Sequence, residues 1–183
     1  MCLRETAMIF GDKARFGIEC EVDAAQLADP KLTEWKYGRV RWWCGGEEVG
    51  RHDVDTPLRD VSLEAERFLA NAGKRRDEGL MGASSEEVVS TLVRALYDDC
   101  GQSDEQVELD EERYRAFVVK PQVDVFDPWD IFLVEGERNA RLIWRSIKDK
   151  NVREHELEAG EFDAVLKLFV GALARAAPMH DRA

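Results

Sequence analysis

Three aspartates in the segment VDVFDPWD come closest to a chemical site in type and spacing. Asp124, Asp127 and Asp130 would supply the carboxylate oxygens that Mg²⁺ and Ca²⁺ prefer. A metal-dependent hydrolase is therefore one function that this segment allows. The same spacing also arises where a turn joins two strands, and Asp127 followed by proline is ordinary turn chemistry. The turn is the favoured interpretation, and the metal site is the alternative.

Other residues that could do chemistry stand alone. His52 lies beside Asp53 and Asp55 in an expected loop, and EWK at residues 34–36 resembles half of a nuclease site by chance. The sequence lacks the phosphate-binding glycine loop, the dinucleotide-binding glycine motif, the nucleophile elbow and the zinc-protease motif. We therefore predict no enzyme, no catalytic, metal or cofactor-binding residue, and no cofactor.

The run DDCGQSDEQVELDEE, residues 98–112, is the most unusual stretch of the chain. One interpretation is a contact surface for a basic partner, and the other is a solvated connector after a helix. Negative charge at a helix C-terminus is unfavourable by about 0.3–1 kcal/mol per residue, so the presence of Asp98 and Asp99 there needs a reason, and both interpretations stay open. The predicted contact residues are its eight carboxylates: Asp98, Asp99, Asp104, Glu105, Glu108, Asp110, Glu111 and Glu112.

Composition limits the partners and the location of the protein. The 183 residues carry 38 acidic and 26 basic side chains, a formal charge of −12, which disfavours nucleic acid and anionic membranes as ligands. The four cysteines are far apart and predict reduced thiols rather than a zinc site or disulfides. The N-terminal residues lack a signal-peptide pattern, and no apolar run is long enough to span a membrane. A cytoplasmic location is predicted.

The first half of the chain predicts strands and then two helices. Residues 16–23 alternate as a half-buried strand, 24–34 form a loop, and 35–50 form a hairpin around Gly45 and Gly46. Adjacent Trp42 and Trp43 point to opposite faces, so at least one is core and the other is an exposed contact. A helix is expected from Thr56 to Gly73, and another from the Ser84 capping box to about Asp98, with a mobile loop between them.

The second half predicts more strands and a last helix. Segments 115–120, 123–127, 130–136 and 140–147 alternate and predict a three-stranded meander that joins the hairpin's sheet, followed by a helix around Phe162 to Leu173. The expected fold class is α+β, with one mainly antiparallel sheet of about five to six strands and about three packed helices. Residues 8–176 are predicted as a single domain, 1–7 as an N-terminal extension that need not be ordered, and 177–183 as a frayed tail.

Several ordered blocks of sequence resemble the Immunity protein 42 family of bacterial polymorphic toxin systems, over about residues 8–175. The blocks are MIFGDKARFGIECEVD from Met8, WKYGRVRWWCGGEEVGRHD, TPLRDVSLEAERFLANAGKR, VDVFDPWDIFLVEGERNARLIWR and the GEFD of residues 160–163. Family members usually begin at the methionine that corresponds to Met8, so translation from Met1 or from Met8 stays open. The blocks are explained as fold positions, namely turn glycines such as Gly11, Gly38 and Gly46 and core residues such as Trp35, Leu58 and Trp129.

The resemblance implies a function in interbacterial competition. Such a protein is encoded beside a secreted toxin, and it binds and neutralises that toxin by stoichiometric protein–protein interaction. The expected partner is a cognate toxin domain with a basic surface that acts in the cytosol, such as a nuclease, and the eight carboxylates of residues 98–112 are its expected contacts. The chain is expected to be a monomer or a homodimer. The alternatives are the metal-dependent hydrolase and a non-catalytic scaffold unrelated to toxins.

Overall fold

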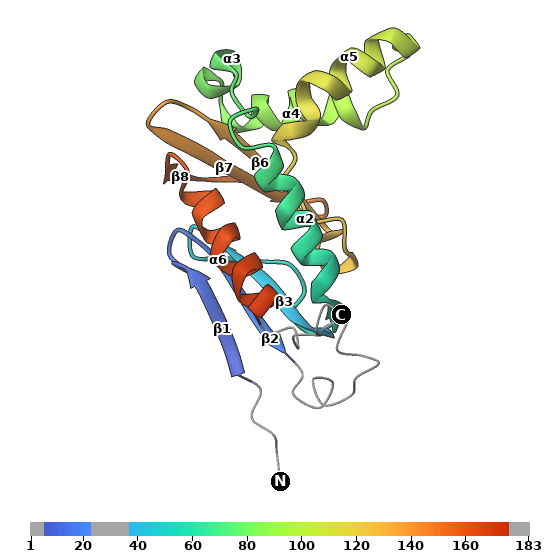
Figure 1. The fold of residues 1–183 in the computed structure, drawn as a ribbon. Helices are drawn as coiled ribbons and strands as arrows, with labels where there is room; N and C mark the ends of the chain where they lie inside the picture. Colours follow the sequence, from blue (N-terminus) through green and yellow to red (C-terminus); the bar gives the residue numbers. More distant parts are fainter. Residues whose placement is uncertain (1–5, 23–36, 176–183) are drawn as a thin grey trace, which may run out of the picture. The chain divides into compact units, whose positions relative to one another are not determined.

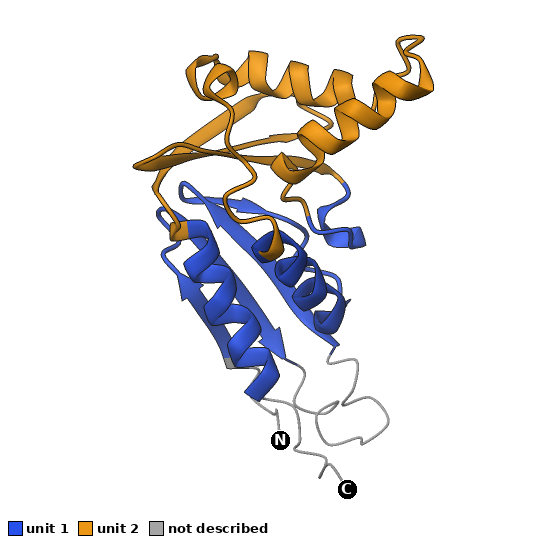
Figure 2. Cartoon of the chain, turned by 45° about the horizontal axis from the view of Figure 1, so that its top comes forward, with its two compact units in different colours: residues 1–69, 121–127, 162–183 blue, residues 70–120, 128–161 orange. Residues whose placement is uncertain are grey.

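A computed structural model describes residues 6–22 and 37–175 and confirms the α+β class. The chain forms two compact units, coloured separately in Figure 2. The first comprises Met1–Leu69, Pro121–Asp127 and Phe162–Ala183, and the second comprises Ala70–Lys120 and Pro128–Glu161. Each unit has its own antiparallel sheet, whereas the sequence predicted one sheet.

The sheet of the first unit has the strand order β1-β2-β3-β4, with β5 pairing with β3. Its strands are β1 (Thr6–Gly11), β2 (Phe16–Val22), β3 (Tyr37–Cys44), β4 (Glu47–Val49) and β5 (Thr56–Pro57). The strand at residues 16–22 and the hairpin are therefore confirmed. Gly45 and Gly46 both have positive φ, 57° and 87°, which is the backbone that a two-residue hairpin turn requires.

Two helices, α2 (Leu58–Ala70) and α6 (Glu161–Arg175), cover one face of this sheet (Figure 1). The period-two alternation places Trp42 on this face, where its ring contacts Phe16, Phe68 and Phe162. Trp42 is fully buried, so the prediction that one tryptophan of the pair is core is confirmed. Helix α2 begins at Leu58 rather than at Thr56, because Thr56 pairs with Gly38 in the sheet.

The second unit corrects the predicted meander. Its three-stranded sheet has the order β6 (Trp129–Glu135), β7 (Asn139–Ser146) and β8 (Val152–Glu158), separate from the first sheet. The segments 115–120 and 123–127 contain the short 3₁₀ helices η1 (Arg115–Phe117) and η2 (Asp124–Phe126) instead of strands. Strand β8 was missed because its sequence, VREHELE, buries only Leu157 and has no apolar alternation to find.

Three further helices belong to the second unit, so the described residues hold five α-helices rather than about three. Helix α3 (Glu78–Gly82) lies where a mobile loop was predicted, and its N-cap Asp77 accepts a hydrogen bond from the backbone N–H of Leu80. Helix α4 (Ser85–Leu96) has the predicted Ser84 capping box. Helix α5 (Asp104–Tyr114) takes up most of the acidic run.

Helix α4 packs on the sheet of the second unit. Its inward residues Val88, Val89 and Leu92 are buried in one apolar cluster with Phe132 and Ile143 of the strands. This helix in turn carries α5, so the apolar spacing of α4 determines where the acidic residues lie.

Some predictions fall outside the described residues: the loop at 24–34, the EWK segment, Trp35, residues 1–5 and the tail at 177–183. Thr6 and Ala7 lie in β1, paired with Val22 and Glu21, and the domain limits themselves stay a prediction. Among the described residues, no helix combines the length and the apolarity needed to cross a membrane.

Candidate functional site

The acidic run forms a helix that begins with a proper cap. The side chain of Ser103 accepts a hydrogen bond from the backbone N–H of Gln106 at 3.2 Å. Asp104 and Glu105 then lie in the first turn of α5, where negative charge interacts favourably with the helix dipole. Asp98 and Asp99 lie in the connection between α4 and α5. The interpretation of the run as a connector therefore holds only for its first residues.

Helix α5 buries none of its residues, and its two long faces have different surroundings. Gln106, Asp110 and Tyr114 line a hollow shared with α4. Asp104, Glu108 and Glu112 recur every fourth residue on the opposite side, and Glu105 lies beside them. All four of these carboxylates are exposed. We call Asp104, Glu105, Glu108 and Glu112 the acidic stripe.

The other four predicted contact residues are not part of the acidic stripe. Asp110 accepts a hydrogen bond from Gln106 at 2.9 Å, and Glu111 forms a two-pronged ion pair with Arg115. The hydrogen bonds from Arg115 lower the pKa of Glu111. Asp99 accepts a bond from the backbone N–H of Gly101, and Asp98 is exposed in the same connection. The structure therefore brings together four of the eight predicted residues.

Exposed apolar side chains lie next to the acidic stripe. Leu109 and Val107 of α5 are 53% and 44% exposed, and Tyr97 at the end of α4 is also exposed. Apolar anchors surrounded by charged residues are typical of protein-binding surfaces. Sequence reasoning missed these residues because single apolar residues inside an acidic run follow no recognisable period.

Polar contacts fasten α5 to the rest of its unit. Arg113 donates to Asp77, the N-cap residue of α3, at 2.9 Å. The pKa of Asp77 is lowered by the Leu80 backbone N–H and by Arg113. The side chain of Gln102 reaches the backbone carbonyl of Arg94 in α4 at 3.4 Å. These few contacts hold the acidic helix without burying it.

A buried arginine positions α3 and α4, and so indirectly α5. Arg141 of β7 donates to the backbone carbonyls of Leu80, Met81 and Ala83 at 2.8–3.1 Å, where α3 ends and α4 begins. Its other nitrogens donate to both carboxylate oxygens of Glu154 in β8, at 2.9 and 2.7 Å. Arg141 therefore links α3 and α4 to the sheet of this unit by hydrogen bonds, in addition to the apolar packing of α4.

The second tryptophan of the pair, Trp43, lies on the face of the first sheet opposite α2 and α6. Its indole N–H donates to Glu19 at 2.8 Å, and the same carboxylate accepts from Arg41 at 2.9 Å and Lys13 at 2.8 Å. These bonds, that from Arg41 above all, lower the pKa of Glu19 from 4.5 to about 2. The cluster fixes the ring of Trp43 in place, and its role as an exposed contact stays a prediction.

The structure does not support the metal-site alternative. Asp130 is paired with Arg145 at 2.9 Å across β6 and β7, and Asp124 opens the 3₁₀ helix η2. Within residues 6–22 and 37–175 there is no group of three or more His, Cys, Asp and Glu side chains that would hold a metal ion. His52 lies near Glu21, at 3.8 Å, rather than in a catalytic cluster.

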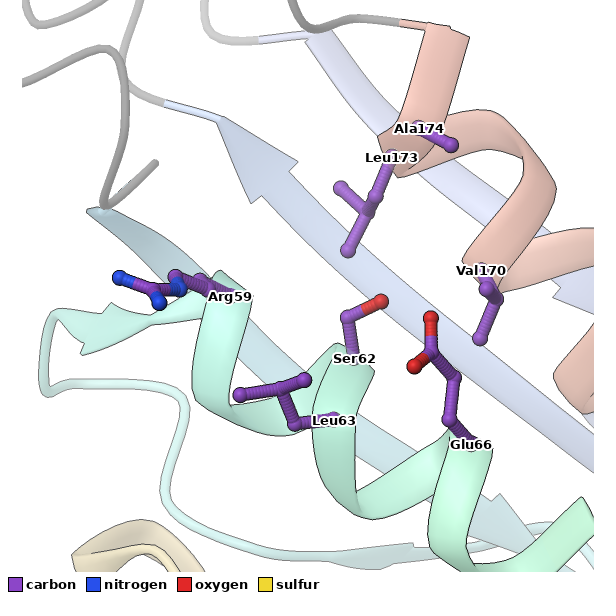
Figure 3. A pocket seen from close by; sticks show the side chains of 7 residues that line it. All are labelled: Arg59, Ser62, Leu63, Glu66, Val170, Leu173 and Ala174. Atoms are coloured by element: carbon purple, nitrogen blue, oxygen red, sulfur yellow. The ribbon is translucent and has the colours of Figure 1, made fainter. Parts of the chain in front are cut away.

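A small hollow between α2 and α6 of the first unit has a different character (Figure 3). Val170 and Leu173 form its apolar wall, and the carboxylate of Glu66 and the hydroxyl of Ser62 point into it. Its volume is about 210 Å³. The residues that line it include one hydroxyl, that of Ser62, and no histidine.

Comparison with known proteins gives one similar fold and one matching family. The fold is similar to that of CdiI from Burkholderia dolosa in its crystal structure, with a TM-score of 0.67 at 20% identity over 92% of this chain and 99% of that one. At this identity the likeness concerns the fold alone. No curated protein sequence matches the chain.

The family model for Immunity protein 42 matches residues 8–171. The chain belongs to the Immunity protein 42 family, as its sequence blocks indicated. It is therefore an immunity protein, and its function is to neutralise a toxin.

Proposed function

We propose that this protein neutralises its cognate toxin by stoichiometric binding, without catalytic turnover, and that the acidic stripe of α5 is the main contact surface. The observation that carries the proposal is the alignment of Asp104, Glu105, Glu108 and Glu112 on the side of α5 that faces away from α4. The partner that such a surface fits is a basic face of a toxin.

The acidic stripe weakens the helix that carries it. Asp104 and Glu108, and likewise Glu108 and Glu112, are like-charged neighbours four residues apart, and each such pair destabilises a helix by roughly 0.2–0.5 kcal/mol. Only Glu111 and Asp110 have partners within α5 or just beyond it. A bound cationic surface would remove this repulsion, so the arrangement is explained by a partner rather than by the stability of the chain.

The expected benefit is rapid capture. Complementary charge raises association rates by about 10- to 1000-fold over uncharged surfaces, and a toxin must be captured before it acts. Leu109 and Val107, exposed beside the acidic stripe, would then supply the apolar contacts that slow dissociation. The charge and the apolar residues have separate kinetic roles.

The proposal places both proteins in the cytoplasm. The chain has the composition of a cytosolic protein with reduced cysteines, so the toxin that it meets is one that acts there. An acidic inhibitor fits a toxin whose own ligand is anionic, and a nuclease is the class that we propose.

A rescue experiment tests the function. The C-terminal domain of the toxin encoded beside this protein is expressed in a sensitive host, with and without the protein, and the two chains are then purified together. We expect survival and a stable 1:1 complex. Persistent toxicity in cells that contain the soluble immunity protein would refute the pairing, and survival without a complex would refute stoichiometric binding.

Neutralising the acidic stripe tests the surface. The variant Asp104→Asn, Glu105→Gln, Glu108→Gln, Glu112→Gln is expected to associate with the toxin roughly tenfold more slowly or worse, and with a weaker dependence on salt. Stopped-flow or biosensor kinetics at several salt concentrations measure both effects. The stability of the helix should change little, because the lost dipole interaction of Asp104 and Glu105 is offset by the removal of the two like-charge pairs.

The matched control changes the net charge by the same amount elsewhere. It replaces four exposed carboxylates outside α5: Asp53→Asn, Asp55→Asn, Glu137→Gln and Asp149→Asn. We expect this control to retain most of the association rate. Equal slowing in both variants would show that net charge alone matters and would reject α5 as the contact surface.

A further inference from the structure

Strand β1 leaves one edge of the first sheet open. It pairs with β2 on one side, and among the described residues no strand pairs with its other side; Figures 1 and 2 show it at the border of the sheet. The opposite border of that sheet consists of β4 and β5, with three and two residues. In the second unit, the edge strand β8 is highly charged. The outer edge of β6 is partly occupied, because Val118 pairs with Phe132 and the N–H of Val119 donates to the carbonyl of Ile131. Of these edges, only that of β1 is both long and without protection.

The hydrogen-bond pattern shows which groups of β1 face outward. The N–H of Asp12 donates to the carbonyl of Phe16 at 3.0 Å, so this pair is of the hydrogen-bonded type. Bonded and non-bonded pairs alternate along an antiparallel ladder, so Phe10 and Met8 also bond to β2. The backbone N–H and C=O groups of Ala7 and Ile9 therefore point away from β2, toward the open edge.

Exposed aliphatic side chains lie on both sides of this edge. Ile9 is 50% exposed on the face that carries Glu19. On the other face, Phe10 contacts Phe169 of α6, so this helix lies over β1. Leu168 of α6 is 57% exposed, and it lies roughly 200° around the helix from Val170, which faces α2. Leu168 is therefore on the side of α6 nearest the open edge.

Strand β1 also lacks the devices that keep sheet edges from pairing. Its sequence, TAMIFG, contains no charged residue and no proline, whereas every other strand longer than two residues carries charge. Natural proteins usually guard an exposed edge with lysine, proline, a bulge or a very short strand. On a chain of charge −12, this apolar edge is a place where a second strand can pair without like charges meeting along the two strands.

We propose that two copies of this protein associate through β1, which pairs antiparallel with the second copy's β1 across a two-fold axis at Met8. In this register Ala7 lies opposite the second copy's Ile9, and both outward-facing residues form hydrogen bonds. The small side chain of Ala7 leaves room for Ile9, and the two Leu168 side chains lie at the border of the dimer interface. Such a contact is self-complementary, as a two-fold interface requires, and it uses no residue of the acidic stripe.

Sedimentation equilibrium of the full chain over a range of concentrations tests the dimer. The wild type should approach twice the chain mass of 20.9 kDa. Ile9→Lys should weaken dimerisation by about tenfold or more, because it places a charge in the dimer interface. Since Ile9 is exposed in the monomer, the substitution should leave the fold unchanged. Leu63→Lys is the matched control, since Leu63 is 52% exposed on α2, away from β1. A wild type that stays monomeric, or a dimer that Ile9→Lys does not weaken, would overturn the proposal.

A cysteine cross-link tests the register. In a Cys2→Ser, Cys20→Ala, Cys100→Ser background, Met8→Cys places two thiols opposite each other at the axis, within the reach of a disulfide. Cys20 is replaced because it lies opposite Met8 on β2 and would compete by forming a disulfide within one chain. Mild oxidation should then produce a covalent dimer in a non-reducing gel, and Leu63→Cys in the same background should not. Equal cross-linking by both variants would reject pairing at β1 in favour of random collision.

Discussion

Replacing Arg141 with alanine is expected to lower the free energy of unfolding by about 3–5 kcal/mol. The guanidinium is nearly inaccessible to solvent, and it satisfies the carbonyls of Leu80, Met81 and Ala83 as well as the carboxylate of Glu154. Removing it leaves a partly buried carboxylate and several carbonyls without their partner. Arg141→Lys should recover only part of the loss, because a single ammonium cannot reproduce the guanidinium fork.

Denaturant unfolding, with Arg145→Ala as the matched control, measures this effect. Arg145 lies on the same strand and makes one ion pair with Asp130. Its side chain is 21% exposed, against 9% for Arg141, so its removal should cost less, roughly 1 kcal/mol. Because Arg141 joins α3 and α4 to the sheet, Arg141→Ala should also weaken toxin binding without touching the acidic stripe. Similar losses in the two variants would contradict the central role of Arg141.

Replacing Glu19 with glutamine should cost about 3 kcal/mol of stability near neutral pH. The carboxylate accepts bonds from Arg41, Lys13 and Trp43 on one oxygen and is almost fully buried. The three donors, with Arg41 the strongest, hold the pKa of Glu19 near 2 instead of 4.5. Glutamine keeps the shape but not the charge that these donors require.

The contribution of Glu19 has a defined pH window. A carboxylate whose pKa is lower in the folded state stabilises the fold fully above its unfolded pKa, about 4.5, and this stabilisation is lost as the pH falls toward 2. The stability difference between wild type and Glu19→Gln should therefore be constant above about pH 5.5 and shrink steadily below pH 4.5.

Urea unfolding between neutral pH and the acid limit measures this window. Glu48→Gln is the control, because Glu48 pairs with the same Arg41 but is half exposed, so its removal should change stability by at most about 1 kcal/mol. A difference for Glu19→Gln that does not vary with pH would show that the stabilisation comes from packing instead of charge.

Local patterns predicted the elements whose residues carry a clear period or cap. The strand from Phe16 to Val22, the Gly45–Gly46 turn, and the Ser84 and Glu87 box all appear in the structure as expected, although Gly17 and Glu19 are buried too and the strand is not half-exposed. Strand β8 could not be predicted, because a charged strand at a sheet edge has little burial to shape its sequence. The segments at 115–120 and 123–127 alternate as strands do, yet Phe117, Val125 and Phe126 are buried from 3₁₀ turns, and Val118 makes only an isolated bridge to Phe132.

At the candidate site, too, the sequence predicted some features of the acidic run and only the structure showed the others. Its composition alone predicted an interaction surface, but it did not predict that Ser103 caps a helix or that Glu111 forms an ion pair with Arg115. The grouping of Asp104, Glu105, Glu108 and Glu112 depends on helical geometry and on which side of α5 meets α4. Leu109 and Val107 became candidates for apolar contacts only when their exposure was known.

By itself the sequence determined the α+β class, the absence of common catalytic motifs, the acidity, and the resemblance to the Immunity protein 42 family. All of these depend on residue types and on the spacing of residues within short segments, which are properties of the sequence and do not require the fold to be known. Only the tertiary structure decided that there are two sheets, that Arg141 joins helices to strands, and that β1 has an open edge. These depend on contacts between residues far apart along the chain, such as Arg141 with Leu80. The spacing of residues within one short segment does not predict such contacts.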